Sequence, residues 1–280
     1  MVRASLIVNP FAHRVTEERV RQVEAELDPV ETFLTQRRGH AIDLARGASG
    51  DVVWVLGGDG LVNEVLNGLR PGVPLGIVPG GYTNVLARAL GVRAGPFGAR
   101  QPRRISLGRV NGRRFAFAAG IGVDSEAVRA METERRAHEG RRPGDLAYAR
   151  DIAARLLRGY ESSLEVRGVG RAALLFVSND STFTYAGRIP LRFSPEARFE
   201  LGLDYAALER MRPGSITGVL ARILAGRGLA GSPGALSGHD LDRIEVACDR
   251  PRPLQADGED LGDVTEAVFE AERDAVSVLA

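Results

Sequence analysis

Two glycine-rich segments stand where strand-like runs end, and both could bind phosphate. Residues 57–60 (Gly-Gly-Asp-Gly) follow the apolar run 52–56, and residues 79–84 (Pro-Gly-Gly-Tyr-Thr-Asn) follow the apolar run 75–78. Each segment leads into a stretch with helical spacing. Glycines let a backbone approach a ligand closely, and a helix N-terminus offers unpaired N–H groups with partial positive charge. The pattern therefore predicts two phosphate-binding turns.

Asp59 lies inside the first of these turns. A carboxylate beside phosphates is repulsive unless Mg²⁺ lies between them, so Asp59 predicts a metal, held directly or through water. The alternative is that Asp59 caps the helix and the glycines form an ordinary turn. Two such turns at the carboxyl ends of strands in one sheet point to a single crevice, which favours ligand binding. The turn is not a dinucleotide fingerprint, because Asn63 replaces the third glycine.

The sequence contains no lysine, and this excludes several kinds of chemistry. A Walker A loop and a protein kinase both need a lysine on the phosphates, and Schiff-base catalysis needs a lysine amine. The four histidines are scattered without the spacing of metal ligands, which argues against a zinc site. Any cationic side chain at the phosphates must be an arginine, and Arg14 and Arg88 are the candidates.

The elements that would position these residues change in kind along the chain. Residues 1–100 alternate strand and helix patterns, which predicts a Rossmann-like α/β domain with a largely parallel sheet. Residues 105–270 are richer in strand-like runs, including 163–167, 172–178, 198–203, 243–247 and 264–270, and 226–238 reads as a glycine-rich loop. Asn111-Gly112 joins the strand-like runs 105–110 and 113–118 and predicts a hairpin, and residues 91–104 suit a linker. The pattern predicts a second, β-rich domain.

Bulk composition limits the classes of function. A chain of 280 residues suggests two domains, and a formal net charge of +1 argues against nucleic acid as the main partner. The single cysteine, Cys248, excludes an intrachain disulfide and fits a cytoplasmic, reducing compartment. No apolar run reaches the ~18 residues needed to span a bilayer, and the N-terminus reads as a strand rather than a signal peptide.

Several motifs, in this order and spacing, resemble one known family. Residues 57–60 with Asn63-Glu64, and 79–84 with the helix that follows, resemble the catalytic domain shared by diacylglycerol kinases, sphingosine kinases and bacterial lipid kinases. Asn9-Pro10, Thr35, the Gly-Ile-Gly-Val-Asp run at 120–124 and Asp257-Gly258-Glu259 extend the resemblance along nearly the whole chain.

The resemblance implies a fold, a cofactor set and a list of site residues. It implies a β-sandwich-like second domain, a nucleotide in the cleft between the domains, and ATP with Mg²⁺ as cofactors. It also implies that residues 271–280 return to the first domain. Glu259 would be the catalytic proton acceptor and Asp59 the catalytic, metal-linked carboxylate. The residues alone, without the resemblance, favour a solvated position in a hairpin turn for Glu259. The expected nucleotide-binding residues are Asn9, Thr35, Gly57, Gly58, Asp59, Gly60, Leu61, Val62, Asn63, Glu64, Gly81, Tyr82 and Thr83.

Three departures from the family pattern leave alternatives open. Leu61 stands where most members have threonine, Tyr82 where a small hydroxyl residue is usual, and Leu201 where an aspartate helps to hold a second, structural Mg²⁺. The second metal site is therefore in doubt unless Glu200 substitutes. These changes sustain the alternative of a nucleotide-binding regulatory protein. NAD kinases, which share the Gly-Gly-Asp-Gly loop, are the other alternative.

A lipid substrate, most plausibly of the diacylglycerol type, requires contact with a membrane surface. A basic cluster at Arg135, Arg136, Arg141 and Arg142, beside the apolar residues Ile152, Leu156 and Leu157, is the candidate surface. A solvated charge run on a packed helix explains the same residues.

Overall fold

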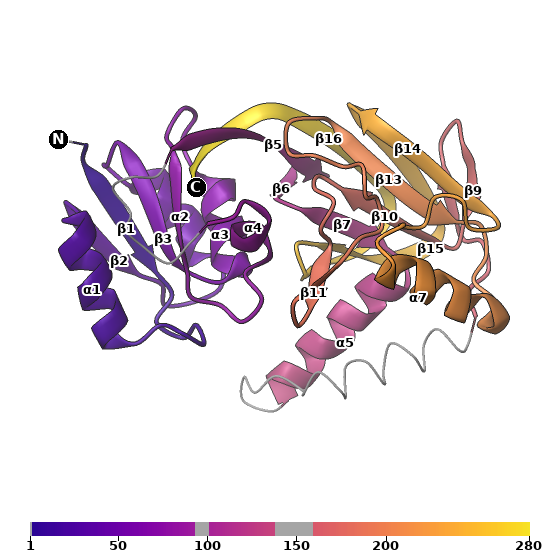
Figure 1. The fold of residues 1–280 in the computed structure, drawn as a ribbon, viewed down its shortest axis with the longest axis horizontal. Coiled ribbons are helices and arrows are strands. Elements are labelled where there is room, and N and C mark those ends of the chain that lie inside the picture. Colours follow the sequence, from indigo (N-terminus) through magenta and orange to yellow (C-terminus); the bar gives the residue numbers. More distant parts are fainter. Residues whose placement is uncertain (1, 93–100, 138–158) are drawn as a thin grey trace. The chain divides into compact units, whose positions relative to one another are not determined.

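In the computed structural model, residues 2–92, 101–137 and 159–280 are described, and they divide into two compact units (Figure 1). Unit 1 contains Met1–Leu107, Arg113–Ala116 and Glu272–Ala280, and unit 2 contains Gly108–Gly112 and Phe117–Ala271. The sequence pattern does not predict that Arg113–Ala116 belongs to unit 1.

Unit 1 alternates strands and helices as the sequence predicts. Its elements are β1 (Ala4–Val8), α1 (Glu17–Leu27), β2 (Glu31–Leu34), α2 (His40–Gly47), β3 (Val52–Gly57), α3 (Asp59–Gly68), β4 (Leu75–Pro79) and α4 (Val85–Ala89). The strands pair in parallel in the order β4-β3-β1-β2, and the end of the last strand of the chain, β16 (Glu259–Leu279), joins β4 in parallel. Trp54, Leu56 and Val8 form part of the buried core beneath α1. An α/β fold with a parallel sheet is confirmed for this unit.

Two further strands contribute to unit 1. β5 (Pro102–Val110) and β6 (Arg113–Phe115) are joined by Asn111-Gly112, whose positive φ angles of 46° and 86° are those of a tight hairpin turn. The predicted hairpin is therefore confirmed. β6 contacts α3, which brings Arg113 and Arg114 to that helix.

Unit 2 is antiparallel and β-rich. Its strands follow the order β14-β13-β10-β7-β15-β16, formed by β14 (Ala235–Leu241), β13 (Leu203–Leu208), β10 (Leu174–Ser178), β7 (Ala118–Ile121), β15 (Arg243–Ala256) and the first part of β16. β8 (Leu164–Val166) and β9 (Gly170–Ala172) extend the sheet from β15, and β11 (Thr184–Ala186) pairs separately with β12 (Ile189–Leu191). α5 (Val123–Ala137) packs on β7 and β15.

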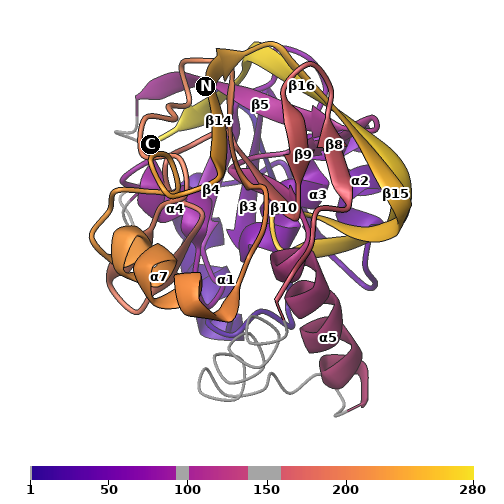
Figure 2. The same cartoon turned by 90° about the vertical axis from the view of Figure 1, so that its right-hand side faces the viewer.

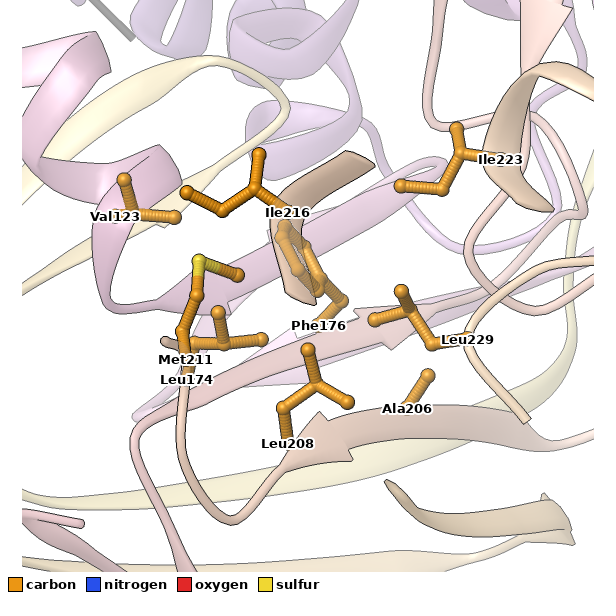
Figure 3. Packing of buried hydrophobic residues seen from close by; sticks show 9 residues of the cluster. All are labelled: Val123, Leu174, Phe176, Ala206, Leu208, Met211, Ile216, Ile223 and Leu229. Atoms are coloured by element: carbon orange, nitrogen blue, oxygen red, sulfur yellow. The ribbon is translucent and has the colours of Figure 1, made fainter. Parts of the chain in front are cut away.

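A helix that the sequence analysis did not anticipate covers one core of unit 2. This is α7 (Ile216–Leu224), preceded by the 3₁₀ turn η1 (Pro213–Ser215). Ile216 and Ile223 of α7 lie over Phe176, Leu208 and other buried side chains (Figure 3). Among the described residues, no helix is both long enough and apolar enough to cross a bilayer.

Two of the predicted boundaries in unit 2 are wrong. Residues 198–202 form turns rather than a strand, because the Leu201 N–H donates to the Arg198 carbonyl at 3.0 Å. The glycine-rich stretch does not stay a loop up to residue 238, because Gly238 pairs with Tyr205 in β14–β13 and leaves room for the tyrosine ring.

Candidate functional site

The candidate residues of unit 1 gather at the carboxyl edge of its parallel sheet. Val8 at the end of β1 is in register with Leu34 of β2 and Leu56 of β3, and Gly57 is in register with Pro79 of β4. The residues that follow each strand therefore leave the sheet along one edge. β1 lies between β2 and β3, so the strand order reverses here, and ligands of open α/β sheets bind at such a switch point.

The two glycine turns are in direct backbone contact. The Gly80 N–H donates to the Gly57 carbonyl at 2.7 Å. A Cβ on Gly81 would lie 2.5 Å from the Gly58 Cα, closer than real Cβ contacts come. These positions require glycine because the two loops pack against each other. The sequence pattern explained the glycines by the approach of a ligand or by an ordinary turn, and not by a contact between the loops.

The first glycine turn leads directly into α3. Gly58 is the N-cap and has no side chain with which to cap the helix, so the first-turn amides remain suited to an external acceptor. Gly58, Asp59 and Gly60 are half-buried, whereas Leu61 is 5% exposed and packs beneath Gly57. The departure at Leu61 thus places an apolar side chain in the interior of the turn. The backbone here can hold an anion such as a phosphate.

Asp59 links the two turns through its side chain. Its Oδ1 accepts a hydrogen bond from the Leu86 N–H at 3.2 Å, so it caps the neighbouring helix α4. Among the described residues, no group of three or more His, Cys, Asp or Glu side chains is placed to hold a metal ion. A single carboxylate nevertheless suits Mg²⁺, which commonly keeps several waters and is held by one or two carboxylates together with substrate phosphates.

Asn84 shapes the second turn and was not among the predicted site residues. Its Oδ1 accepts from the Gly81 N–H at 2.8 Å, and its Nδ2 donates to the Gly81 carbonyl at 2.9 Å. Its φ of 51° is in the left-handed region, which asparagine tolerates better than most residues. The available signal was its position at the end of the glycine motif.

Tyr82 and Thr83 lie in the middle of the second turn. Tyr82 is 55% exposed, and its ring packs edge-on against His13 with the centroids 5.9 Å apart. Thr83 is half-buried. The tyrosine ring therefore lies on the surface next to the loop that follows β1.

That first loop brings further candidates to the same edge. The Asn9 Oδ1 accepts from the Phe11 N–H at 3.0 Å, which makes a compact turn, and the Arg14 N–H donates to the Gly80 carbonyl at 2.9 Å. Thr35 is 7% exposed, and its N–H donates to the Val8 carbonyl. Asn9, Thr35 and both glycine turns are thus neighbours, and the Arg88 side chain is exposed on α4.

Asn63 and Glu64 use their side chains inside unit 1. Asn63 donates to the Arg114 carbonyl at 3.1 Å and accepts from Arg113 at 2.8 Å. The buried Glu64 carboxylate accepts from the Gly39 and Ala41 N–H groups, at 2.8 and 3.1 Å, and so caps α2. These contacts give both side chains a structural role that the motif did not reveal.

Glu259 belongs to unit 2 and lies beside a hairpin turn. Asp257 and Gly258, with φ of 49° and 77°, form the two-residue connection between β15 and β16, and Ala256 pairs with Glu259. The Asp257 Oδ1 accepts from the Phe117 and Ala118 N–H groups, at 3.0 and 3.2 Å, which ties the turn to β7. The hairpin interpretation of this motif is therefore correct. Glu259 itself is half-buried.

A second carboxyl group, Asp124, connects to the same turn. The Gln255 Nε2 donates to Asp124 Oδ2 at 2.9 Å, and Gln255 Oε1 accepts from the Gly258 N–H at 3.0 Å. Burial raises the pKa of Asp124 to about 6, although the hydrogen bond from Gln255 acts in the opposite direction. Gly120 must lack a side chain because its Cβ would collide with this carboxylate. The motif at 120–124 was noted in the sequence, but Asp124 was not assigned a role.

Asp204 lies close in sequence to Leu201, where the second metal site was in doubt, and its carboxylate is hydrogen-bonded to protein groups. Its buried carboxylate accepts from the His239 Nδ1 at 2.9 Å and from the Asp240 N–H at 3.0 Å. The hydrogen bond to Asp204 raises the pKa of His239. Gly202 in turn donates to the Asp240 carboxylate. The segment is therefore organised by a histidine–aspartate pair.

The predicted basic membrane cluster lies outside the part of the chain that the structure describes in side-chain detail. Arg135 and Arg136 fall in α5 without described side chains, and residues 141–157 are not described. Its role stays a prediction.

Comparison with known proteins agrees with the fold and with the motifs. Residues 3–111 match the family model described as the diacylglycerol kinase catalytic domain. A diacylglycerol kinase of Bacillus subtilis is 34% identical over 142 residues, which is 44% of this chain and 46% of that protein. The matched segment spans about half the length of the curated relatives.

Solved structures show the same architecture over the whole chain. A diacylglycerol kinase from Bacillus anthracis superposes with a TM-score of 0.68 at 20% identity, covering 99% of this chain and 96% of that one. An NAD kinase from Archaeoglobus fulgidus in complex with ATP superposes with a TM-score of 0.51 at 14% identity, covering 99% and 93%. The predicted resemblance is confirmed for residues 3–111, which match the diacylglycerol kinase catalytic-domain model and resemble proteins named diacylglycerol kinase and putative lipid kinase.

Proposed function

We propose that this protein transfers the γ-phosphate of ATP, with Mg²⁺, to the hydroxyl of a lipid, with diacylglycerol as the first candidate substrate. The observation that carries the proposal is the pair of touching glycine turns at the open N-terminus of α3, within a segment of the diacylglycerol kinase catalytic family. The enzyme would be cytoplasmic and would bind peripherally to the membrane that contains its substrate.

The residues of unit 1 would bind the nucleotide. Backbone N–H groups at Gly58–Leu61 and at Tyr82–Thr83 would donate to the phosphates, and Asn84 holds the second turn in shape through the Gly81 N–H. Asp59 would hold Mg²⁺, directly or through water. The ion would offset the charge of the phosphates, and positioning with charge stabilisation supplies most of the catalysis in phosphoryl transfer.

Glu259 would act as the general base. The lipid hydroxyl oxygen attacks the γ-phosphorus while its proton passes to the Glu259 carboxylate, and the bond to the bridging oxygen breaks to release ADP. Asp257 would be a positioning residue, because it anchors the turn that precedes Glu259.

Two observations favour other candidates. The fold is shared with an ATP-bound NAD kinase, so the hydroxyl acceptor could be NAD. Leu61 is buried and Tyr82 is exposed where the family pattern usually has hydroxyl residues, which is the reason to consider a nucleotide-binding regulator without transfer activity.

The test is phosphate transfer from labelled ATP–Mg²⁺ to detergent-dispersed diacylglycerol, a sphingoid base, phosphatidylglycerol and, without lipid, NAD. We expect lipid-dependent transfer that Glu259→Gln and Asp59→Asn each reduce by about 10²-fold or more. Glu26→Gln, an exposed change on α1, is the matched control. Transfer to NAD alone would reassign the acceptor, and nucleotide binding without any transfer would support the regulator.

A further inference from the structure

Helix α7 has an outward face that is unusual for a protein surface. Its inward face is formed by Ile216, Val219 and Ile223, which pack on the unit 2 core. The outward positions carry no charge: they are Thr217, Gly218, Leu220, Ala221, Leu224 and Ala225. A surface helix normally presents polar and charged residues to water, so a helix that is apolar all round calls for a partner.

Two leucines on this face are openly exposed. Leu220 is 44% exposed and Leu224 is 59% exposed, and they lie one helical turn apart on the same side of α7. Views at right angles both place α7 on the outer side of the unit 2 strands (Figures 1 and 2). β12, which contacts α7, adds Ile189, which is 53% exposed.

The segments around this face are basic and contain no acidic residue. Four arginines and no Asp or Glu lie between Glu209 and Asp240 in the sequence. The segment between Asp180 and Glu196 also lacks Asp and Glu, and its charged residues are Arg188 and Arg192. Arg212 and Arg227, just before η1 and just after α7, are exposed, as is Arg188. The chain segments on either side of α7 therefore carry a net positive charge, although Glu161 pairs with Arg210 at 3.5 Å.

The single arginine within α7 does not disturb its apolar face. The Arg222 guanidinium donates to the Gly228 carbonyl at 3.3 Å and to the Ala230 carbonyl, so it is turned toward the loop that follows the helix. This loop in turn docks on the core, because the Leu229 N–H donates to the Phe193 carbonyl at 3.0 Å. Arg222 thus holds the helix in place instead of covering its leucines.

We propose that the outward face of α7 docks on the surface of an anionic membrane, with Leu220 and Leu224 entering the interface and Arg188, Arg212 and Arg227 contacting acidic headgroups. Interfacial helices lie in the membrane plane with the apolar face down and are held by apolar burial and by attraction to anionic lipid. The charge pattern favours this occupant: the exposed Arg188, Arg212 and Arg227 complement an acidic lipid surface.

This inference rests on the proposed function, because a lipid kinase must reach a substrate that lies in a bilayer. It adds a second candidate surface to the basic cluster at Arg135, Arg136, Arg141 and Arg142, whose role stays a prediction. The two leucines on α7 are described in the structure, and their exposure can be tested without any assay of phosphate transfer.

Vesicle flotation of the full chain tests the docking surface. We expect binding to phosphatidylcholine vesicles that contain phosphatidylglycerol, weaker binding to pure phosphatidylcholine, and weaker binding at high salt. Leu220→Glu with Leu224→Glu should lower the partition coefficient by about tenfold or more. Arg212→Gln and Arg227→Gln should each lower it by roughly fivefold at low salt. Val169→Glu, at a valine that is 47% exposed in the β8–β9 turn, is the matched control and should bind like the unaltered protein.

Two further readouts separate the outcomes. Circular dichroism and thermal melting should show that the double glutamate variant folds normally, since both leucines are exposed. In the kinase assay, this variant should keep its activity on detergent-dispersed lipid and lose it on vesicles. If kinase activity were absent from every variant, flotation would still decide the docking surface.

Two results would overturn the proposal. One is unchanged vesicle binding by the double glutamate variant. The other is a change in mass by analytical ultracentrifugation, from dimer to monomer in that variant with vesicle binding intact, which would show that a second copy of the chain covers α7.

Discussion

Single residues decide whether the two glycine turns can touch. Gly58 and Gly81 approach so closely that neither can carry a Cβ without moving the other loop, and Asn84 and Asp59 add side-chain hydrogen bonds that fix the same pair. The sequence identifies the glycines but not their contact, because residues 61–78 separate the two motifs in the chain.

Gly81→Ala should separate the turns. Its Cβ would meet the Gly58 Cα at 2.5 Å, so one loop must shift, and a displacement of this size at a site of phosphate positioning costs about 10²-fold in activity. Nucleotide affinity measured by calorimetry and transfer measured with labelled ATP should both fall. Gly47→Ala, where nothing lies within 4 Å of the added Cβ, is the control and should be neutral or slightly stabilising. Equal nucleotide affinity of Gly81→Ala and the unaltered protein would refute the close-contact argument.

Asp124 should make the free energy of unfolding fall as the pH rises, which is the reverse of the usual effect of a carboxyl group. Burial raises its pKa from 3.8 to about 6, so the folded protein holds the proton more tightly than the unfolded chain. The free energy of unfolding therefore falls as the pH rises through this interval, by at most about 3 kcal/mol, and the contribution is level above it. In urea unfolding, the unfolding free energy of the unaltered protein minus that of Asp124→Asn should fall by up to about 3 kcal/mol from pH 4 to pH 6, because the variant has no carboxyl group to titrate at this position. If this value rose over the same interval, the fold would stabilise the carboxylate and not the neutral acid.

Elements in unit 1 are held by groups that the sequence pattern assigns to other tasks. Periodicity predicts α1, α3 and the parallel strands because each buries one face or both faces. It does not predict that α2 is capped from α3, by a glutamate 23 residues away in the chain from Ala41. Nor does it predict α7 of unit 2, which has leucines on its exposed face as well as apolar residues on its buried face. The two features have one cause. Glu64 reaches α2, and the unit 2 core reaches α7, only after the chain has folded.

Glu64→Gln should therefore loosen α2 even though the residue lies in the phosphate motif. The buried carboxylate accepts two N–H groups, and its loss should lower the free energy of unfolding by about 1–3 kcal/mol, measured by urea denaturation. Hydrogen exchange should locate the change at Gly39–Ala41. Glu26→Gln on α1 is the control, with a change within about 0.5 kcal/mol. A large loss of nucleotide affinity without loss of stability would instead assign Glu64 to the ligand.

Across the whole molecule, the chain contributes to unit 1 at both its beginning and its end. Residues 272–280 return to the parallel sheet, where Val278 pairs with Leu75 and Leu279 with Gly76. The repeating strand–helix pattern indicates the first four strands of this sheet. The fifth is harder to assign, because β16 is a single strand of 21 residues whose first part belongs to unit 2. An alternating pattern alone does not show where a strand changes its partners.

Val278→Asp tests how far unit 1 depends on this last strand. Val278 is fully buried, and an unpaired carboxylate there should cost about 4 kcal/mol or more. Because Val278 pairs with β4, hydrogen exchange should accelerate first in β4 and β3, while β10 and β13 keep their protection as parts of unit 2. Thr265→Asp, at an exposed position of the same strand, should change neither set of amides. Nucleotide affinity should fall with the protection of β4, since the second glycine turn follows that strand. If β4 kept its protection in Val278→Asp, unit 1 would be complete without the end of the chain, and the return of β16 would be a surface addition to an α/β sheet that is stable by itself.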